Sequence, residues 1–278
     1  MTHIYFSQRT GTNPNLKGLP LDEITMLFER VYDQLVDEGY FVEAFGYSCT
    51  DAGHVAGLVR DVELEILLSV RKRNLWPIAA HRWEYDEDDL FDLIEFLFQH
   101  VSKPIDGFHH SHNGCGMHWE TFNREEGRAK FLEKINSVLV QYERPFELSA
   151  RGEVLTKPEA GFETIFNADT PSNEPKIVER INSAILSYRR HGSTLADRRQ
   201  AVCDLIGVLE YLRPQVKALL TRADENDLFN IANNFGLRHN NDTQKTNYDA
   251  SLWLSWMFYY YLATIHVVLR KIEHDGSK

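Results

Sequence analysis

One short polar segment brings together the residue types that phosphate chemistry uses. Residues 233–241 read Asn-Asn-Phe-Gly-Leu-Arg-His-Asn-Asn and lie between two apolar stretches that favour helices. Arg238 supplies a permanently charged, planar fork of donors that suits phosphate, and His239 carries an imidazole that can transfer a proton near neutral pH. These are the parts that a metal-independent ribonuclease needs. The residues available to orient a bound strand are Asn234, Asn240 and Asn241.

The same segment also has a purely structural interpretation. Asn233 and Asn234 could end the first of the two helices. Arg238 could pair with a nearby aspartate, and His239 would then be a surface residue without a chemical role. The residues alone leave both interpretations open.

A second cluster, over residues 108–119, contains the side chains that bind zinc. It reads Phe-His-His-Ser-His-Asn-Gly-Cys-Gly-Met-His-Trp. Cys115 and His118 are separated by two residues, a spacing that lets a thiolate and an imidazole reach one ion. Two further ligands are available among His109, His110 and His112. Because structural zinc sites usually have two well-separated ligand pairs, the single loop favours a packed turn, with no metal and no cofactor. In the alternative interpretation, in which the loop binds zinc, the candidate ligands are His109, His112, Cys115 and His118.

The composition is that of a folded, acidic protein. The 278 residues are 43% hydrophobic and 12% aromatic, which is enough for one large domain or two ordinary ones. The formal net charge of -11 opposes a broad surface for nucleic acid, so any RNA contact has to be local. Three widely spaced cysteines predict a reducing, cytoplasmic environment, and neither a signal peptide nor a membrane span is expected.

Apolar residues at helical spacing predict a mainly α-helical fold. Short apolar segments around a glycine turn near residues 147–155 predict a small β-hairpin between two parts. We therefore expect an N-terminal helical domain over residues 1–145 and a C-terminal helical bundle over residues 146–278. Helices are expected to begin near residues 21, 61, 86, 124, 175, 194, 225 and 249, and the helix from 194 is expected to continue to 222. The acidic run at 86–89 suits a helix start, because carboxylates favour the positive end of the helix dipole.

The last expected helix, over residues 249–273, carries three stripes at helical spacing. Two are apolar: one holds Trp253, Trp256, Tyr260, Thr264 and Val267, and the other holds Leu254, Phe258, Tyr261, Ile265 and Val268. Such a helix should be buried on two sides, as the centre of a bundle or in a dimer interface. His266 lies on the third and most polar stripe, where it is either solvated or bonded to a neighbouring helix, or serves as a second catalytic imidazole.

The C-terminal part resembles a known group of proteins. The stretch Leu-Phe-Asn-Ile-Ala-Asn-Asn-Phe-Gly-Leu-Arg-His at 228–239, followed by Trp253 and Trp256, looks like the helical domains of bacterial abortive-infection proteins, which resemble the HEPN superfamily. The front half is similar in layout to AbiJ-type N-terminal regions, through Phe-Ser-Gln-Arg-Thr-Gly at 6–11 and Asn-Leu-Trp-Pro-Ile at 74–78. The resemblance covers most of the chain as pattern and layout.

This resemblance implies an anti-phage effector that acts as a metal-independent ribonuclease and works as a homodimer. Arg238 would hold the phosphate of RNA, and His239 or His266 would transfer the proton. The chain departs from the HEPN pattern, in which a histidine follows the arginine by four to six residues, because no histidine lies between His239 and His266. The alternative is a non-catalytic regulatory or sensing subunit that binds a partner or antitoxin protein through its aromatic C-terminal helix.

Overall fold

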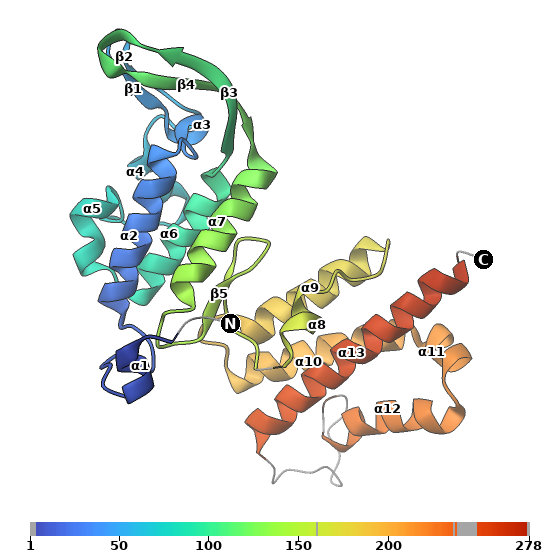
Figure 1. The fold of residues 1–278 in the computed structure, drawn as a ribbon. Coiled ribbons are helices and arrows are strands. Elements are labelled where there is room, and N and C mark those ends of the chain that lie inside the picture. Colours follow the sequence, from blue (N-terminus) through green and yellow to red (C-terminus); the bar gives the residue numbers. More distant parts are fainter. Residues whose placement is uncertain (1–3, 160, 236, 238–248, 277–278) are drawn as a thin grey trace. The chain divides into compact units, whose positions relative to one another are not determined.

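The computed structural model describes residues 4–159, 161–235, 237 and 249–276. Over these residues the protein is mainly α-helical, as the sequence predicted, and its strands form only two-stranded sheets. The chain divides into two compact units, between Leu155 and Thr156 (Figure 1). The small hairpin therefore belongs largely to the first unit, and the units divide later in the chain than the boundary expected at residue 145.

The N-terminal unit is a group of helices with hairpins attached. Its helices are α1 (Phe6–Thr10), α2 (Leu21–Asp37), α3 (Val42–Phe45), α4 (Val62–Ser69), α5 (Ile78–His81), α6 (Glu87–His100) and α7 (Arg124–Leu139), with the short 3-10 turns η1 (Arg82–Glu84) and η2 (His112–Gly114). Its strands are β1 (Tyr47–Cys49), β2 (Gly53–Val55), β3 (Lys103–His110), β4 (Gly116–Asn123), β5 (Phe146–Leu148) and β6 (Val154–Thr156), paired in that order as three hairpins.

Helix α6 begins at a side-chain cap and contributes a row of leucines to the core of the N-terminal unit. The Asp86 carboxylate accepts a hydrogen bond from the Asp89 backbone N–H at 2.8 Å, and the Asp89 carboxylate accepts one from the Asp86 N–H at 3.2 Å. This reciprocal cap confirms the helix start that the acidic run predicted. Downstream, Leu90, Leu93 and Leu97 are fully buried, and they pack among the core side chains of α2 and α7.

The β5–β6 hairpin was predicted from the sequence, whereas the β3–β4 hairpin was not. The β5–β6 hairpin is where a hairpin was predicted, and the Asn136 side chain of α7 bonds the backbone N–H and carbonyl of Leu148 at 2.7 and 2.9 Å. The β3–β4 hairpin occupies the histidine-rich segment that was interpreted as a loop. A Cβ atom at Gly107 would overlap the carbonyl oxygen of His118, so glycine lets the two strands approach.

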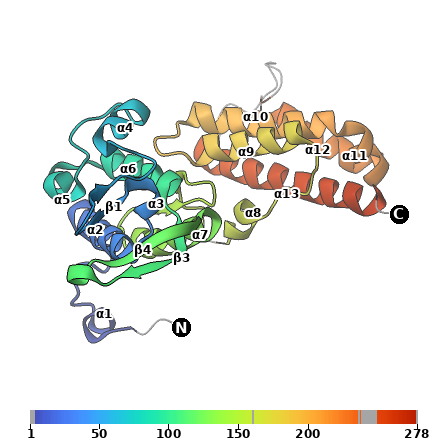
Figure 2. The ribbon, with the colours of Figure 1, turned by 90° about the horizontal axis from the view of Figure 1, so that it is seen from above.

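The C-terminal unit is a helical bundle of α8 (Glu163–Asn167), α9 (Pro175–Arg189), α10 (Leu195–Tyr211), α11 (Arg213–Leu219), α12 (Arg222–Asn234) and α13 (Ala250–Gly276). Helices α9, α10 and α13 run alongside one another (Figures 1 and 2). The single helix expected over residues 194–222 is wrong, because the chain breaks at Leu212 into α10 and α11. Pro214, in the first turn of α11, has no backbone N–H to continue the ladder.

Helix α13 provides much of the core of this unit. The Tyr188 ring stacks on Phe258 at 4.0 Å between centroids, and the Tyr188 hydroxyl lies 2.7 Å from that of Ser255. The helix is long and apolar enough to pass a test for a membrane span, but 61% of that window is buried inside the structure. This burial is what a core helix of a folded unit shows.

Candidate metal centre

The predicted Arg-His-Asn site can be placed only in part. Arg238, His239, Asn240 and Asn241 lie outside the described residues. Asn234, the last residue of α12, is exposed. Leu237, directly before Arg238, is buried, and its carbonyl oxygen accepts a hydrogen bond from the Cys203 thiol at 3.1 Å. Burial raises the pKa of Cys203, which keeps the S–H that donates this bond.

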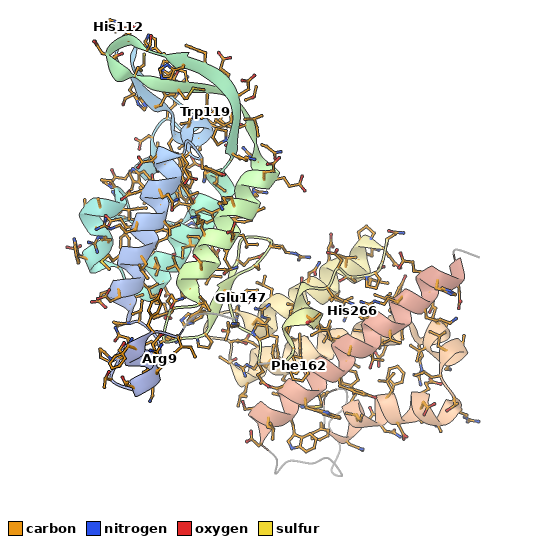
Figure 3. All side chains as sticks on the ribbon, viewed as in Figure 1. Arg9, His112, Trp119, Glu147, Phe162 and His266 are labelled. Atoms are coloured by element: carbon orange, nitrogen blue, oxygen red, sulfur yellow. The ribbon has the colours of Figure 1, made fainter. Side chains whose placement is uncertain are left out.

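His266 lies on the inner side of α13 (Figure 3). Only 6% of its surface is exposed, and its Nδ1 has no hydrogen-bond partner among the described residues. Burial, and then the charge of Arg270, lower the pKa of the imidazole, so it is neutral at pH 7. A side chain this enclosed has little surface with which to touch a polynucleotide.

The stripes of α13 are buried in an unexpected combination. The stripe of Leu254, Phe258, Tyr261, Ile265 and Val268 is buried, and so are Ser255, Tyr259, Leu262 and His266 of the polar stripe. The other apolar stripe is the more exposed one: Trp253 is 38% exposed, Trp256 42% and Val267 67%, while Tyr260 and Thr264 are half-buried. Neighbouring helices, rather than the polarity of each stripe, decide which side of α13 faces inward.

The histidine-rich cluster forms a compact group of donors at the end of the β3–β4 hairpin. β3 ends at His110, η2 forms the turn, and Cys115 directly precedes β4, which contains His118. Figure 3 places His112 at the tip of this hairpin and Trp119 nearer to α7. The turn of the β1–β2 hairpin meets the tip, since the Thr50 hydroxyl donates to the His112 carbonyl at 3.3 Å. This contact places Cys49, the last residue of β1, beside the histidines of the β3–β4 hairpin.

Four donor atoms converge there. The ligand atoms of Cys49, His110, Cys115 and His118 all lie within 4.8 Å of one another. Cys115 Sγ is 3.1 Å from His118 Nε2, and Cys49 Sγ is 3.9 Å from His110 Nδ1. Both cysteines are free thiols. Among the described residues this is the group of histidine, cysteine and carboxylate side chains arranged to hold a metal ion.

The environment favours thiolate and a defined imidazole orientation. Cys49 Sγ accepts a hydrogen bond from the Ala52 N–H at 3.4 Å, and this bond, with one from the Asp51 N–H, lowers the pKa of Cys49. The Asp51 carboxylate lies 3.2 Å from His110 Nε2, which leaves Nδ1 of that ring directed at Cys49. Two backbone N–H groups thus favour the thiolate of Cys49, and the Asp51 carboxylate orients the His110 ring.

Two of the four donors, Cys115 and His118, were predicted from the sequence, and a third, His110, was one of three histidines considered as further ligands. Cys115 and His118 are brought together as the spacing suggested, but Cys49 was missed, and His110 occupies the position expected for His109 or His112. The pairing of Phe108 with His118 and of His110 with Gly116 places His110 and His118 on one face, whereas His109 pairs with Met117 on the other. His112 instead lies 3.5 Å from Asp51. Strand alternation selects His110 only once the segment is known to be a hairpin, and nothing local in the sequence links Cys49 to a segment 61 residues later.

Comparisons with known proteins leave the chain without an assigned relative. No protein-family model matches it, and neither a curated protein nor a solved structure matches it.

Proposed function

We propose that the C-terminal unit pairs with a second copy of the chain through the exposed stripe of α13, in an effector of the abortive-infection kind. The observation that supports this is the exposure of three apolar side chains on one face of α13, Trp253, Trp256 and Val267, with the half-buried Tyr260 between them. Soluble monomers rarely expose a contiguous apolar patch of this kind without a partner. Tryptophan is also enriched among the residues that dominate binding energy at protein interfaces.

The spacing of the stripe suits a second copy of the same helix. The stripe extends through exposed ends and reads Asp249, Trp253, Trp256, Tyr260, Thr264, Val267 and Lys271. The steps between members are 4, 3, 4, 4, 3 and 4 residues, which is the same in both directions about Tyr260. In an antiparallel pair with a two-fold axis at Tyr260, Asp249 faces Lys271 of the other copy, and Trp253 faces Val267. Within one chain Lys271 pairs with Asp275, but this pair is solvent-exposed and contributes little stability. Lys271 can therefore leave Asp275 and pair with Asp249 of the other copy at little cost.

The oligomeric state of the full chain tests this proposal. Wild type should be a dimer by light scattering coupled to size-exclusion chromatography, and Trp256→Ala should weaken dimerisation by about tenfold or more. Asp249→Lys and Lys271→Asp should each weaken the dimer, and the double variant should restore it. Lys176→Asp, an exposed reversal on α9, is the matched control. A monomeric wild type, or a double variant weaker than both single variants, would refute the pairing.

RNA cleavage is a second candidate function, supported by the way the chain enters the Arg-His-Asn segment. Leu237 is buried and its carbonyl oxygen accepts a hydrogen bond from the Cys203 thiol, so the residue before Arg238 in the chain is held against α10. In this proposal Arg238 holds the phosphate and His239 takes the proton from the 2′-hydroxyl, while Asn240 and Asn241 orient the strand. The enclosed position of His266 makes His239 the better proton carrier.

Labelled total RNA incubated with the protein in EDTA tests the cleavage proposal. Wild type should cut, Arg238→Ala and His239→Ala should reduce the rate by about 100-fold or more, and the exposed control Arg222→Ala should not. Intact RNA with wild type would refute cleavage and leave a dimeric module without this activity. A monomer that co-purifies with an antitoxin-like protein would instead refute the self-pairing.

A further inference from the structure

We propose that Cys49, His110, Cys115 and His118 bind one Zn²⁺ ion in a closed, tetrahedral site that joins the β1–β2 turn to the tip of the β3–β4 hairpin. This site lies in the N-terminal unit and goes beyond the function proposed for the C-terminal unit. Its support comes from four independent features: donor geometry, ligand chemistry, the surrounding hydrogen bonds and the lack of other support for the hairpin tip.

The donor geometry fits zinc. Zinc bonds of about 2.0–2.3 Å in a tetrahedron place the ligand atoms about 3.3–3.8 Å apart. The Cys115–His118 and Cys49–His110 donor distances, 3.1 and 3.9 Å, bracket this range, and all four donors lie within 4.8 Å of one another. The widest separation that the 4.8 Å limit allows exceeds the tetrahedral range by about 1 Å, so movements of about half an ångström by each side chain, within reach of side-chain rotation, would complete the tetrahedron.

The ligand chemistry selects zinc over the other common divalent cations. Two thiolates and two imidazoles form the Cys₂His₂ set of structural zinc sites, whereas magnesium and calcium take oxygen ligands. Two thiolates also balance the charge of the ion, which suits a site where Cys49 and His118 are 8% and 6% exposed. Four protein donors leave no open position for substrate, so the role is structural rather than catalytic.

The surroundings hold the ligands in the required orientation. The Asp51 carboxylate, 3.2 Å from His110 Nε2, forms the carboxylate–histidine pair that commonly supports a zinc ligand. The His118 ring contacts the rings of Tyr47 and Phe108, at centroid distances of 4.6 and 5.1 Å. Both imidazoles are therefore oriented before any ion binds.

The hairpin tip has little else to stabilise it. None of the four donor residues belongs to the hydrophobic core of the N-terminal unit. The turn of the β3–β4 hairpin has positive φ angles at Asn113 and Gly114, and Gly116, the first residue of β4, has another. β1 and β2 are three residues each. Such short pairs are marginal in water, so a bound ion that crosslinks the two hairpins supplies the stability that a core would otherwise give.

Metal content of the purified full chain tests the proposal directly. Protein made in zinc-supplemented medium and purified with reductant should contain one zinc per chain by elemental analysis. Cobalt substitution should give the visible and thiolate charge-transfer bands of a tetrahedral thiolate site. His110→Ala and Cys115→Ser should lose the metal, whereas the neighbouring controls His109→Ala and His112→Ala should keep it. Zinc-free wild type that takes up no cobalt, or equal loss in the His109 and His110 variants, would overturn the site.

A milder variant separates ligand loss from misfolding. Asp51→Asn removes no ligand, so the chain should still bind one zinc but with about 10–100-fold lower affinity in a chelator competition. Circular dichroism should show unchanged helix content, because the core does not include the site. Unchanged affinity in Asp51→Asn, together with full zinc retention in Cys115→Ser, would show that the metal is held elsewhere.

Discussion

Replacing Phe258 by alanine should strongly destabilise the C-terminal unit, whereas the same change at Trp256, two residues earlier on α13, should have a small effect. Phe258 is fully buried and stacks on Tyr188 at 4.0 Å, while Trp256 is 42% exposed. Truncating a buried phenylalanine costs about 3–5 kcal/mol, part of it from the lost aromatic pair. Truncating a half-exposed tryptophan should cost about 1–2 kcal/mol, because much of its apolar surface is already in water.

Urea unfolding of the full chain, followed by circular dichroism and by hydrogen exchange of α9 and α10 peptides, measures this difference. A loss of about 4 kcal/mol corresponds to a midpoint shift of about 2 M urea for a transition with a slope of about 2 kcal/mol per molar. The transition of the N-terminal unit is the internal control, since Phe258 lies in the other unit. Dilute protein avoids a contribution from dimerisation. Equal shifts for the two variants, or a larger one for Trp256→Ala, would refute the assignment of the inner and outer faces.

Three further outcomes follow from particular contacts. Asp86→Ala removes the reciprocal cap of α6 and should destabilise the N-terminal unit by about 1 kcal/mol in the same urea assay, with no effect expected on the other unit. The Thr194 backbone N–H, the Thr194 hydroxyl and Arg190 lower the pKa of Asp197 from 3.8 to about 2. This carboxylate therefore stabilises the fold above pH 4 and loses that contribution as the pH falls towards 2. Melting temperatures between pH 5 and 2 should show that loss in wild type and less of it in Asp197→Asn; identical profiles would contradict it. Gly107→Ala should lower zinc content by distorting the β3–β4 hairpin, and Gly114→Ala, whose Cβ meets nothing within 4 Å, is the packing control.

The helical elements were the most predictable part of the fold. α2, α6, α7 and α13 follow apolar residues at helical spacing, and α6 and α7 also begin at side-chain caps, Asp86 and Asn123. Both signals lie within a few residues of one another in the sequence. The break between α10 and α11 was predictable in principle, because Pro214 cannot donate to the preceding turn. The β3–β4 hairpin was missed because histidines, glycines and a cysteine give no apolar alternation that marks a strand.

The sequence by itself determined the helix-rich architecture, the β5–β6 hairpin and the close approach of Cys115 to His118, because each depends on residues a few positions apart. Only the tertiary structure decided which face of α13 is buried and which side chains join the metal centre. The first depends on which helices pack against α13. The second depends on strand pairing, which turns His110 inward and His109 outward, and on the meeting of two hairpins that brings Cys49 to donors far along the chain. Contacts of that range are set by packing and pairing, which leave no local mark in the sequence.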